Sequence, residues 1–196
     1  TTAVDLILGL LEPTGGRILV DGTEINEANR ANWQSIVGYV PQHIYLSDDT
    51  LARNIAFGVP DAEIDMAAVR RAAAIANLSE LVETSLEKGY ETEIGERGVR
   101  LSGGQRQRIG IARALYRDPA ILVMDEATSA LDGVTEESVM NAIHSLSRKK
   151  TIILLAHRLS TLKECDVIFK LEAGAVAASG SYESLLRDSD WFRDAA

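Results

Sequence analysis

The apolar residues of this chain gather in short runs that have the length of β-strands and end at turn-forming or polar residues. The run at residues 121–124 is apolar at every position, which is typical of a strand covered on both faces in a parallel α/β sheet. Asp21-Gly22 and Glu172-Ala173-Gly174 separate neighbouring runs and predict two hairpins. The predicted strands cover residues 17–20, 37–40, 121–124, 151–156, 167–171 and 175–179.

Helices are predicted between these strands. The segment at residues 2–11 is apolar almost all round, which predicts a buried helix. Asp65 and Ser79 are placed to cap the helices that follow them. The predicted helices cover residues 2–11, 65–77, 79–88, 104–116 and 136–147.

The distribution of these elements predicts the domain organisation. Residues 48–117 contain helices and no convincing strand, whereas strands are predicted on both sides of this region. We therefore predict an α/β core with a mainly parallel sheet, built from residues 1–47 and 118–196, into which a helical subdomain is inserted at residues 48–117.

Composition and charge exclude several classes of protein. The formal net charge is −9, so the chain lacks the overall basic character of a protein that binds nucleic acid independently of sequence. No apolar run reaches the ~20 residues needed to cross a bilayer, and no signal peptide is visible, so the polypeptide itself is expected to be soluble. The single cysteine, Cys165, cannot form an internal disulfide and is expected to be a small buried or half-buried side chain.

Two segments carry the strongest chemical signals. The first is Leu101-Ser102-Gly103-Gly104-Gln105, where Ser102 can cap a helix, the glycines allow close approach of a ligand, and the helix N-terminus attracts anions such as phosphate. The second is Asp125-Glu126, which ends a buried strand, so that the two carboxylates diverge and can take separate roles. Alone, the first could be an ordinary turn and the second a solvated acidic turn.

Together these segments resemble the ABC family of ATPases. The pentapeptide followed by Arg106-Gln107-Arg108 is similar to the family's signature sequence, and residues 121–126 resemble its Walker B strand. Ser129-Ala130-Leu131-Asp132 resembles the D-loop that follows. Gln42 after Pro41, and His157 after the run at residues 151–156, stand where the family places its glutamine loop and switch histidine.

The resemblance implies a P-loop NTPase-like fold and a role for each residue. Glu126 is the expected general base, with His157 and Gln42 as further catalytic residues. Mg²⁺ is expected on Asp125, Gln42 and Thr1. ATP is expected to contact residues at the start of the chain, in the signature and in the D-loop, namely Thr1, Thr2, Ser102, Gly103, Gly104, Gln105 and Asp132.

The segment just before the signature favours an exporter. Residues 92–98, Thr-Glu-Ile-Gly-Glu-Arg-Gly, resemble the X-loop of exporters. The sequence of residues 37–42 is similar to that of family members that export lipids or polysaccharides. The alternatives are a soluble ABC ATPase that acts on nucleic acid or ribosomes, which usually carries coiled-coil, zinc or tandem insertions, and a non-ABC P-loop enzyme, against which the signature argues directly.

Thr1 stands where the Ser or Thr of a Walker A loop, G-x-x-x-x-G-K-[S/T], is expected, so the chain resembles a domain truncated just after the lysine. Losing three or more charge-assisted hydrogen bonds would cost at least ~4 kcal/mol, about a thousandfold in affinity. We expect this exact polypeptide to bind ATP poorly and to be inactive alone.

The resemblance also implies partners for the intact protein. ATP is expected between the Walker residues of one copy and the signature of a second nucleotide-binding domain, in a head-to-tail dimer. A transmembrane domain is expected to dock on residues after Gln42 and on the helical subdomain, which implies a location at the cytoplasmic face of a membrane. No nucleic-acid partner is expected.

Overall fold

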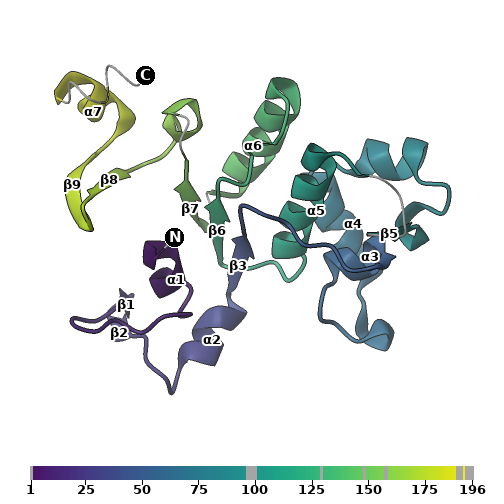
Figure 1. The fold of residues 1–196 in the computed structure, drawn as a ribbon, viewed down its shortest axis with the longest axis horizontal. Coiled ribbons are helices and arrows are strands. Elements are labelled where there is room, and N and C mark those ends of the chain that lie inside the picture. Colours follow the sequence, from purple (N-terminus) through teal and green to yellow (C-terminus); the bar gives the residue numbers. More distant parts are fainter. Residues whose placement is uncertain are drawn as a thin grey trace. The chain divides into compact units, whose positions relative to one another are not determined.

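The structure is a computed structural model that describes residues 2–95, 101–128, 130–147, 149–156, 159–188 and 192. The chain forms two compact units, Thr1–Ile153 and Leu154–Ala196 (Figure 1). Among the described residues, no helix has the length and apolarity that a membrane span requires.

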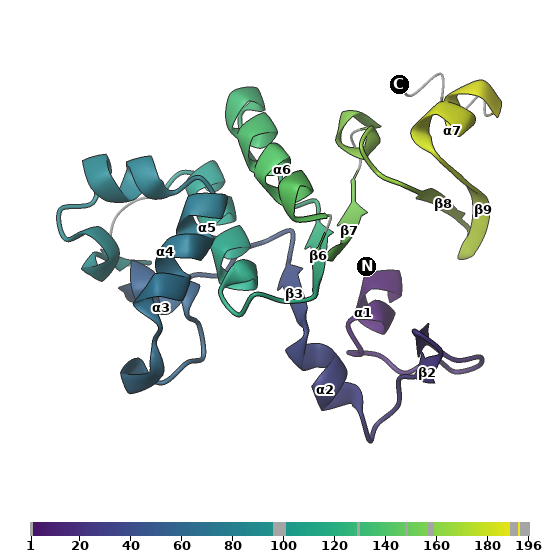
Figure 2. The ribbon, with the colours of Figure 1, turned by 180° about the vertical axis from the view of Figure 1, so that it is seen from behind.

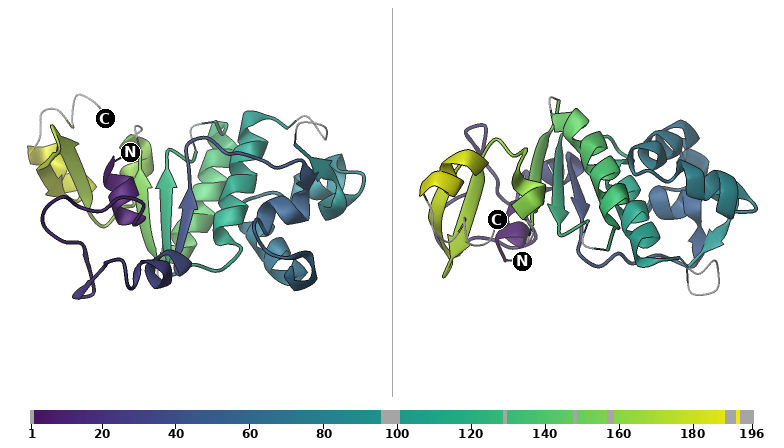
Figure 3. Two further views of the ribbon diagram at one scale, coloured as in Figure 1. Left: turned by 60° about the horizontal axis from the view of Figure 1, so that its bottom comes forward. Right: turned by 90° about the horizontal axis from the view of Figure 1, so that it is seen from above.

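A three-stranded parallel sheet begins in the first unit, and the boundary between the units falls within its last strand. Its strands follow the order β3 (Val37–Val40), β6 (Ile121–Asp125) and β7 (Thr151–Leu155). Strands β3 and β6 are parallel, with Val37 opposite Ile121 and Val40 opposite Met124 (Figure 3). Leu122 and Val123 are fully buried, and burying such a side chain contributes about 1.5–3 kcal/mol. The predicted α/β class and the three predicted strands are therefore observed.

The N-terminal region is less helical than the sequence predicts. Helix α1 (Thr2–Ile7) ends early because Gly9 adopts a left-handed conformation with φ of 66°. The prediction of a buried helix over residues 2–11 is wrong, because the helix ends at Ile7, Val4 is its one fully buried residue, and Leu10 and Leu11 are exposed.

A short hairpin around Asp21-Gly22 and a helix, α2, follow α1 in the chain. Strands β1 (Leu19–Val20) and β2 (Thr23–Glu24) pair as predicted around Asp21-Gly22, where both residues have positive φ. In helix α2 (Arg30–Ser35), Trp33 Nε1 donates to the carbonyl of Ile7 at 2.7 Å, which ties α2 to α1.

Helices dominate the region between β3 and β6, and α3, α4 and α5 pack against one another (Figures 1 and 2). Asp65 caps α4 as predicted, accepting bonds from the N–H groups of Ala67 and Ala68. The region's elements are α3 (Leu51–Ile55), η1 (Asp61–Glu63), α4 (Met66–Ile75), η2 (Leu81–Ser85), η3 (Gly89–Glu91) and α5 (Gly103–Leu115).

Two sequence predictions in this region are wrong. Ser79 does not cap a helix that runs to Lys88. Ser79 already lies inside the helical turn that precedes η2, where the N–H of Val82 donates to the carbonyl of Leu78. The helix ends at Ser85, three residues before Lys88. A short antiparallel pair, β4 (Asp49–Thr50) with β5 (Glu93–Ile94), also occurs where we expected no strand. Strands of two residues are too short to leave an alternating pattern in the sequence.

Helix α6 (Gly133–Ser147) completes the first unit and begins three positions before the predicted residue 136. In the second unit, η4 (Leu159–Leu162) precedes the predicted hairpin, formed by β8 (Ile168–Glu172) and β9 (Ala175–Gly180). Helix α7 (Tyr182–Asp188) follows.

A small core holds this second unit together. Ile168, Leu185 and Phe192 are buried, and the Tyr182 and Phe192 rings meet edge to face with centroids 5.2 Å apart. Cys165 packs against this core and is half-buried, as predicted; burial raises the pKa of its thiol.

Candidate functional site

Gln42 and Glu126 meet at the carboxyl ends of two neighbouring strands. Because β3 and β6 are parallel and Val40 lies opposite Met124, the residues that follow each strand leave the sheet at the same edge. Gln42 Nε2 donates to Glu126 Oε2 at 2.9 Å, although 84 positions separate the two residues. The structure therefore brings together two side chains that the sequence placed in one site.

Asp125 has a partner that the sequence analysis did not assign. The Tyr39 hydroxyl lies 3.5 Å from Asp125 Oδ2, in position to donate a hydrogen bond. Burial raises the pKa of Tyr39, and the carboxylates of Asp125 and Asp5 raise it further, so the phenol keeps its proton at neutral pH. The only signal in the sequence is the place of Tyr39 on a strand that pairs with β6, which becomes informative once the pairing is known.

The backbone of Glu126 is in a sparsely populated conformation. Its φ is 50°, a left-handed value that costs a non-glycine residue about 1–2 kcal/mol. Such strain persists only where surrounding contacts fix the backbone, and it clusters at functional sites. Here the Gln107 side chain holds the carbonyl of Glu126 through a bond of 3.2 Å from Nε2.

The turn before α5 has the capping geometry that its sequence predicts. Ser102 Oγ accepts from the N–H of Gln105 at 3.1 Å, and Gln105 Oε1 accepts from the N–H of Ser102 at 2.8 Å, which completes a capping box. Ser102 is exposed, and Gly103 and Gly104 are half-exposed, so this turn lies at the surface of the chain. A Cβ on Gly104 would lie 3.2 Å from the carbonyl oxygen of Ala130, so glycine allows this close approach.

Asp132 caps α6. Its Oδ1 accepts from the N–H of Thr135 at 3.0 Å. The hydrogen bonds from Thr135, the backbone bond first, hold the pKa of Asp132 below its usual value. Asp132 is exposed, and besides this cap its carbonyl accepts from the N–H of Glu136 at 2.8 Å.

The sequence matches the family described as ABC transporter over residues 1–129. The chain belongs to the ABC transporter family. This family match and the similar proteins given next confirm two predictions: an ABC nucleotide-binding domain of the exporter type, and the α/β fold class.

Similar proteins are exporters of several kinds. The chain is 47% identical to an ATP-dependent lipid A-core flippase of Cupriavidus metallidurans, over 95% of this chain and 31% of that protein. It is 41% identical to an ATM1-type heavy metal exporter of Novosphingobium aromaticivorans, over 100% of this chain and 33% of the relative. A solved bacterial Atm1-family ABC exporter with ATP bound matches with a TM-score of 0.90 and 39% identity, over 98% of this chain and 34% of that one. The chain thus spans about a third of the length of the curated relatives it matches.

Some predicted ABC site residues lie outside the described part of the chain. These are Thr1, His157 and Ser129, and the same holds for residues 96–98 of the X-loop-like segment. Thr2 is the first residue of α1 and is exposed. The roles assigned to all of these residues stay predictions.

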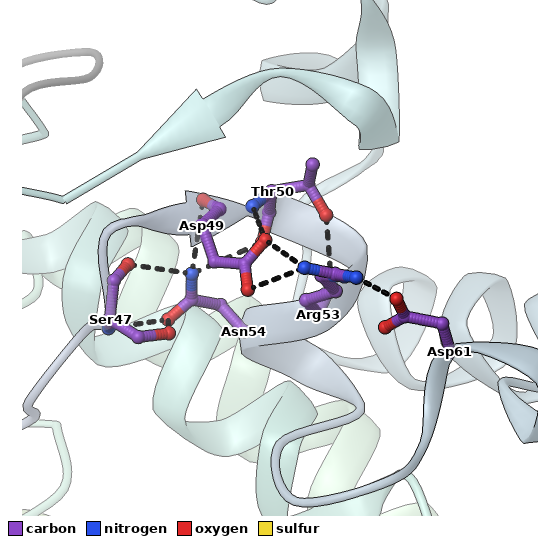
Figure 4. A network of polar contacts seen from close by, with 6 residues as sticks. All are labelled: Ser47, Asp49, Thr50, Arg53, Asn54 and Asp61. Carbon is purple, nitrogen blue, oxygen red and sulfur yellow. Dashed lines mark hydrogen bonds and ion pairs between the residues drawn. The ribbon is translucent and has the colours of Figure 1, made fainter.

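A buried polar network fixes the segment that follows Gln42 in this ABC domain (Figure 4). Asn54 is fully buried, and its Nδ2 donates to the carbonyls of Ser47, Asp49 and Thr50, while its Oδ1 accepts from the N–H of Ser47 at 2.9 Å. Arg53 binds the carboxylates of Asp49 and Asp61 on the outer side of the same turn. Sequence reasoning missed Asn54 because a lone asparagine in a helical stretch carries no periodic signal.

Arg113 connects this network to the signature helix α5. Its Nη1 donates to the carbonyl of Tyr45 and its Nε to the carbonyl of Asn54, both at 2.8 Å. Its guanidinium carbon lies 4.7 Å from the centre of the Phe57 ring, a cation–π distance. Burial lowers the pKa of Arg113, yet arginine remains charged in proteins. The helix that carries the signature is therefore fixed to the segment after Gln42.

Proposed function

We propose that this chain is the ATP-hydrolysing domain of a membrane exporter, in which Glu126 activates water and Gln42 orients it. The observation that carries this proposal is the 2.9 Å contact of the Gln42 amide with the Glu126 carboxylate at the edge where β3 and β6 end. This hydrogen bond holds the Glu126 carboxylate in a fixed direction, and a general base must be so positioned. Phosphoryl transfer then depends on positioning and electrostatics, with the signature turn of a second copy facing the terminal phosphate.

The residues at this edge also fit Mg²⁺. Mg²⁺ prefers oxygen ligands and keeps several waters, so a carboxylate and an amide oxygen suffice as part of its shell. Asp125 supplies the carboxylate. Gln42 donates through its amide nitrogen to Glu126, which leaves the amide oxygen as its ligand atom. When bound, Mg²⁺ neutralises charge on the phosphates; we assign it to Asp125, Gln42 and Thr1.

The proposed partners are a second nucleotide-binding domain and a transmembrane domain at the cytoplasmic face of the membrane. The docking surface for the latter comprises Tyr45 and Phe57, which are 72% and 51% exposed and both contact Arg113. Exposed aromatic side chains of this kind are enriched at protein interfaces. Replacing Tyr45 and Phe57 with serine should uncouple ATPase activity from transport, and full coupling in that variant would refute this surface.

A lipid or polysaccharide is the cargo class we propose. Its support is the 45–47% identity to lipid A-core flippases from four bacterial species, against 41% to a heavy metal exporter. ATPase stimulation of the full-length protein by lipid A-core, and not by heavy metal ions, is expected; the reverse preference would overturn this assignment.

The base assignment is tested by Glu126→Gln in the full-length protein with a phosphate-binding loop ahead of Thr1. Removing a general base typically lowers turnover about 10²–10⁴-fold, while the neutral amide still permits ATP binding. We expect turnover to fall by that factor, Mg²⁺-dependent ATP binding to persist, and ATP-bound dimers to accumulate in size-exclusion chromatography.

Glu24→Gln is the matched control, because Glu24 is exposed on the β1–β2 hairpin. It should leave turnover unchanged. Wild-type turnover by the Glu126→Gln variant would remove Glu126 from the mechanism.

A further inference from the structure

Gln107 is a buried polar side chain that joins three parts of the site. It lies on α5, is 3% exposed, and follows the signature turn by two positions. Its Oε1 accepts from the N–H of Ala130 at 2.8 Å, and its Nε2 donates to the carbonyl of Glu126 at 3.2 Å. One amide group thus binds both the residue after the Walker B strand and the D-loop.

The bond to Glu126 acts on the backbone of the proposed base. Glu126 leaves the sheet with a φ of 50°, so its carbonyl lies outside the regular pairing of β6, which ends at Asp125. The orientation of this peptide decides where the Glu126 side chain points. A carbonyl held by a fixed donor cannot rotate without losing that bond, which for a buried group costs free energy.

The position of Gln107 is itself fixed by the packing of α5. The carbonyl of Ala130 would lie 3.2 Å from a Cβ on Gly104, so the first turn of α5 and the D-loop backbone touch directly. Ile109 and Ile111 on the same helix are fully buried. Gln107 therefore projects from a helix that cannot easily shift relative to the D-loop.

We propose that Gln107 is a positioning residue for ATP hydrolysis, which holds the Glu126 carboxylate and the D-loop in register with the signature helix of the same subunit. In the proposed dimer, the signature turn contacts the nucleotide that the partner subunit binds, whereas Glu126 acts on the nucleotide bound to its own subunit. Gln107 then links the two composite sites within one subunit. This inference rests on the proposed function.

The test is Gln107→Leu in the full-length protein, which nearly keeps the side-chain size and removes both hydrogen bonds. Misplacing a catalytic group by about 1 Å can cost up to ~10²-fold in rate. We expect kcat to fall about 10–100-fold and KM for ATP to change by less than about twofold. Gln34→Leu is the matched control, because Gln34 Nε2 also donates to backbone carbonyls, those of Leu8 and Gly9, away from this site. It should leave kcat unchanged.

A double substitution separates positioning from general structure. If Gln107 acts through Glu126, Gln107→Leu should not lower the residual turnover of Glu126→Gln further. If it merely supports the fold, the two losses should multiply, and this outcome would overturn the proposal.

Gln107→Glu keeps the proposal testable if the leucine variant does not fold. The protonated carboxyl group of this variant can donate to the Glu126 carbonyl and accept from Ala130 N–H, whereas the ionised carboxylate can only accept. Its kcat relative to wild type should therefore rise as pH falls. A ratio that does not change with pH argues against the proposal.

The inference and the proposed function fail in different ways. Loss of ATPase activity by Glu126→Gln, with Gln107→Leu at the wild-type rate, would reject this inference while leaving the proposed function intact. Wild-type turnover by Glu126→Gln would instead reject the proposed function.

Discussion

At the scale of single residues, the candidate site depends on polar side chains whose partners come from distant parts of the chain. Tyr39 and Asp125 are 86 positions apart, and Gln42 and Glu126 are 84 apart. Each pair consists of one residue from β3 or the segment after it and one from the end of β6. The parallel register of two short strands therefore produces both contacts.

Tyr39→Phe tests the raised pKa of Tyr39, which burial causes first and the Asp125 carboxylate second. The pKa of Tyr39 is raised from 10.0 in the folded chain, so the unfolded chain releases the phenol proton first. The stabilisation by the protonated phenol is complete below about pH 10 and is lost as pH rises through the folded pKa.

Urea unfolding of wild type and Tyr39→Phe between pH 8 and pH 11, roughly spanning the tyrosine range, measures this effect. The stability advantage of wild type over the variant should shrink above about pH 10. A difference that stays constant with pH would show that Tyr39 does not titrate with folding.

At the scale of elements, helix α5 is held at both ends. Near its start, Gln107 binds the D-loop and the Glu126 carbonyl; near its end, Arg113 binds the carbonyls of Tyr45 and Asn54. Glycine allows close packing along the way, because a Cβ on Gly38 would lie 2.6 Å from the carbonyl oxygen of Ala114. The helix that carries the signature is thus a rigid connector between the segment after Gln42 and the D-loop.

Arg113→Met measures the strength of this connection. Hydrogen bonds to charged groups contribute about 1.5–3 kcal/mol each. The bond of Arg113 to Asn54 is half-buried and its bond to Tyr45 is exposed, so we expect the free energy of unfolding in urea to fall by about 2–4 kcal/mol. Arg113→Lys should not restore stability, because an ammonium group cannot reproduce the planar fork of donors.

The matched control is Arg71→Met on α4. Arg71 is exposed, and its nearest carboxylate, on Asp65, lies 3.9 Å away, so this change should cost less than about 1 kcal/mol. Equal losses from the two variants would contradict a special role for Arg113.

At the scale of the whole molecule, the proposed site takes its signature turn from a second copy of the chain. The exposed signature turn at Ser102 presents the N-terminus of a 13-residue helix to solvent, with its N–H dipoles favouring an anion. We therefore expect a second copy to bring its bound nucleotide to this turn.

Ser102→Arg tests this assembly. A bulky side chain at the turn should block ATP-dependent dimerisation of the full-length protein while nucleotide binding to the monomer persists. Analytical ultracentrifugation with and without ATP measures the first effect, and nucleotide titration measures the second. Ser35→Arg, at the exposed end of α2, is the control and should dimerise normally. Unchanged dimerisation of Ser102→Arg would refute the composite site.

Several local features were predictable because their causes lie close together in the sequence. The strand at residues 37–40, the caps at Asp65 and Ser102, and the hairpin at residues 168–180 are all observed. Where a tertiary contact or a glycine conformation intervened, prediction failed, as at the early end of α1 at Gly9.

The sequence by itself determined the family, the fold class and the residue types of the candidate site, because apolar periodicity, capping residues and contiguous motifs act over a few positions. Only the tertiary structure decided which groups meet: the side chains of Gln42 and Glu126, the Gln107 side chain and the Ala130 N–H, and the Arg113 side chain and the Tyr45 carbonyl. These partners are 84, 23 and 68 positions apart, so their contacts depend on strand register and helix packing, which no local pattern records.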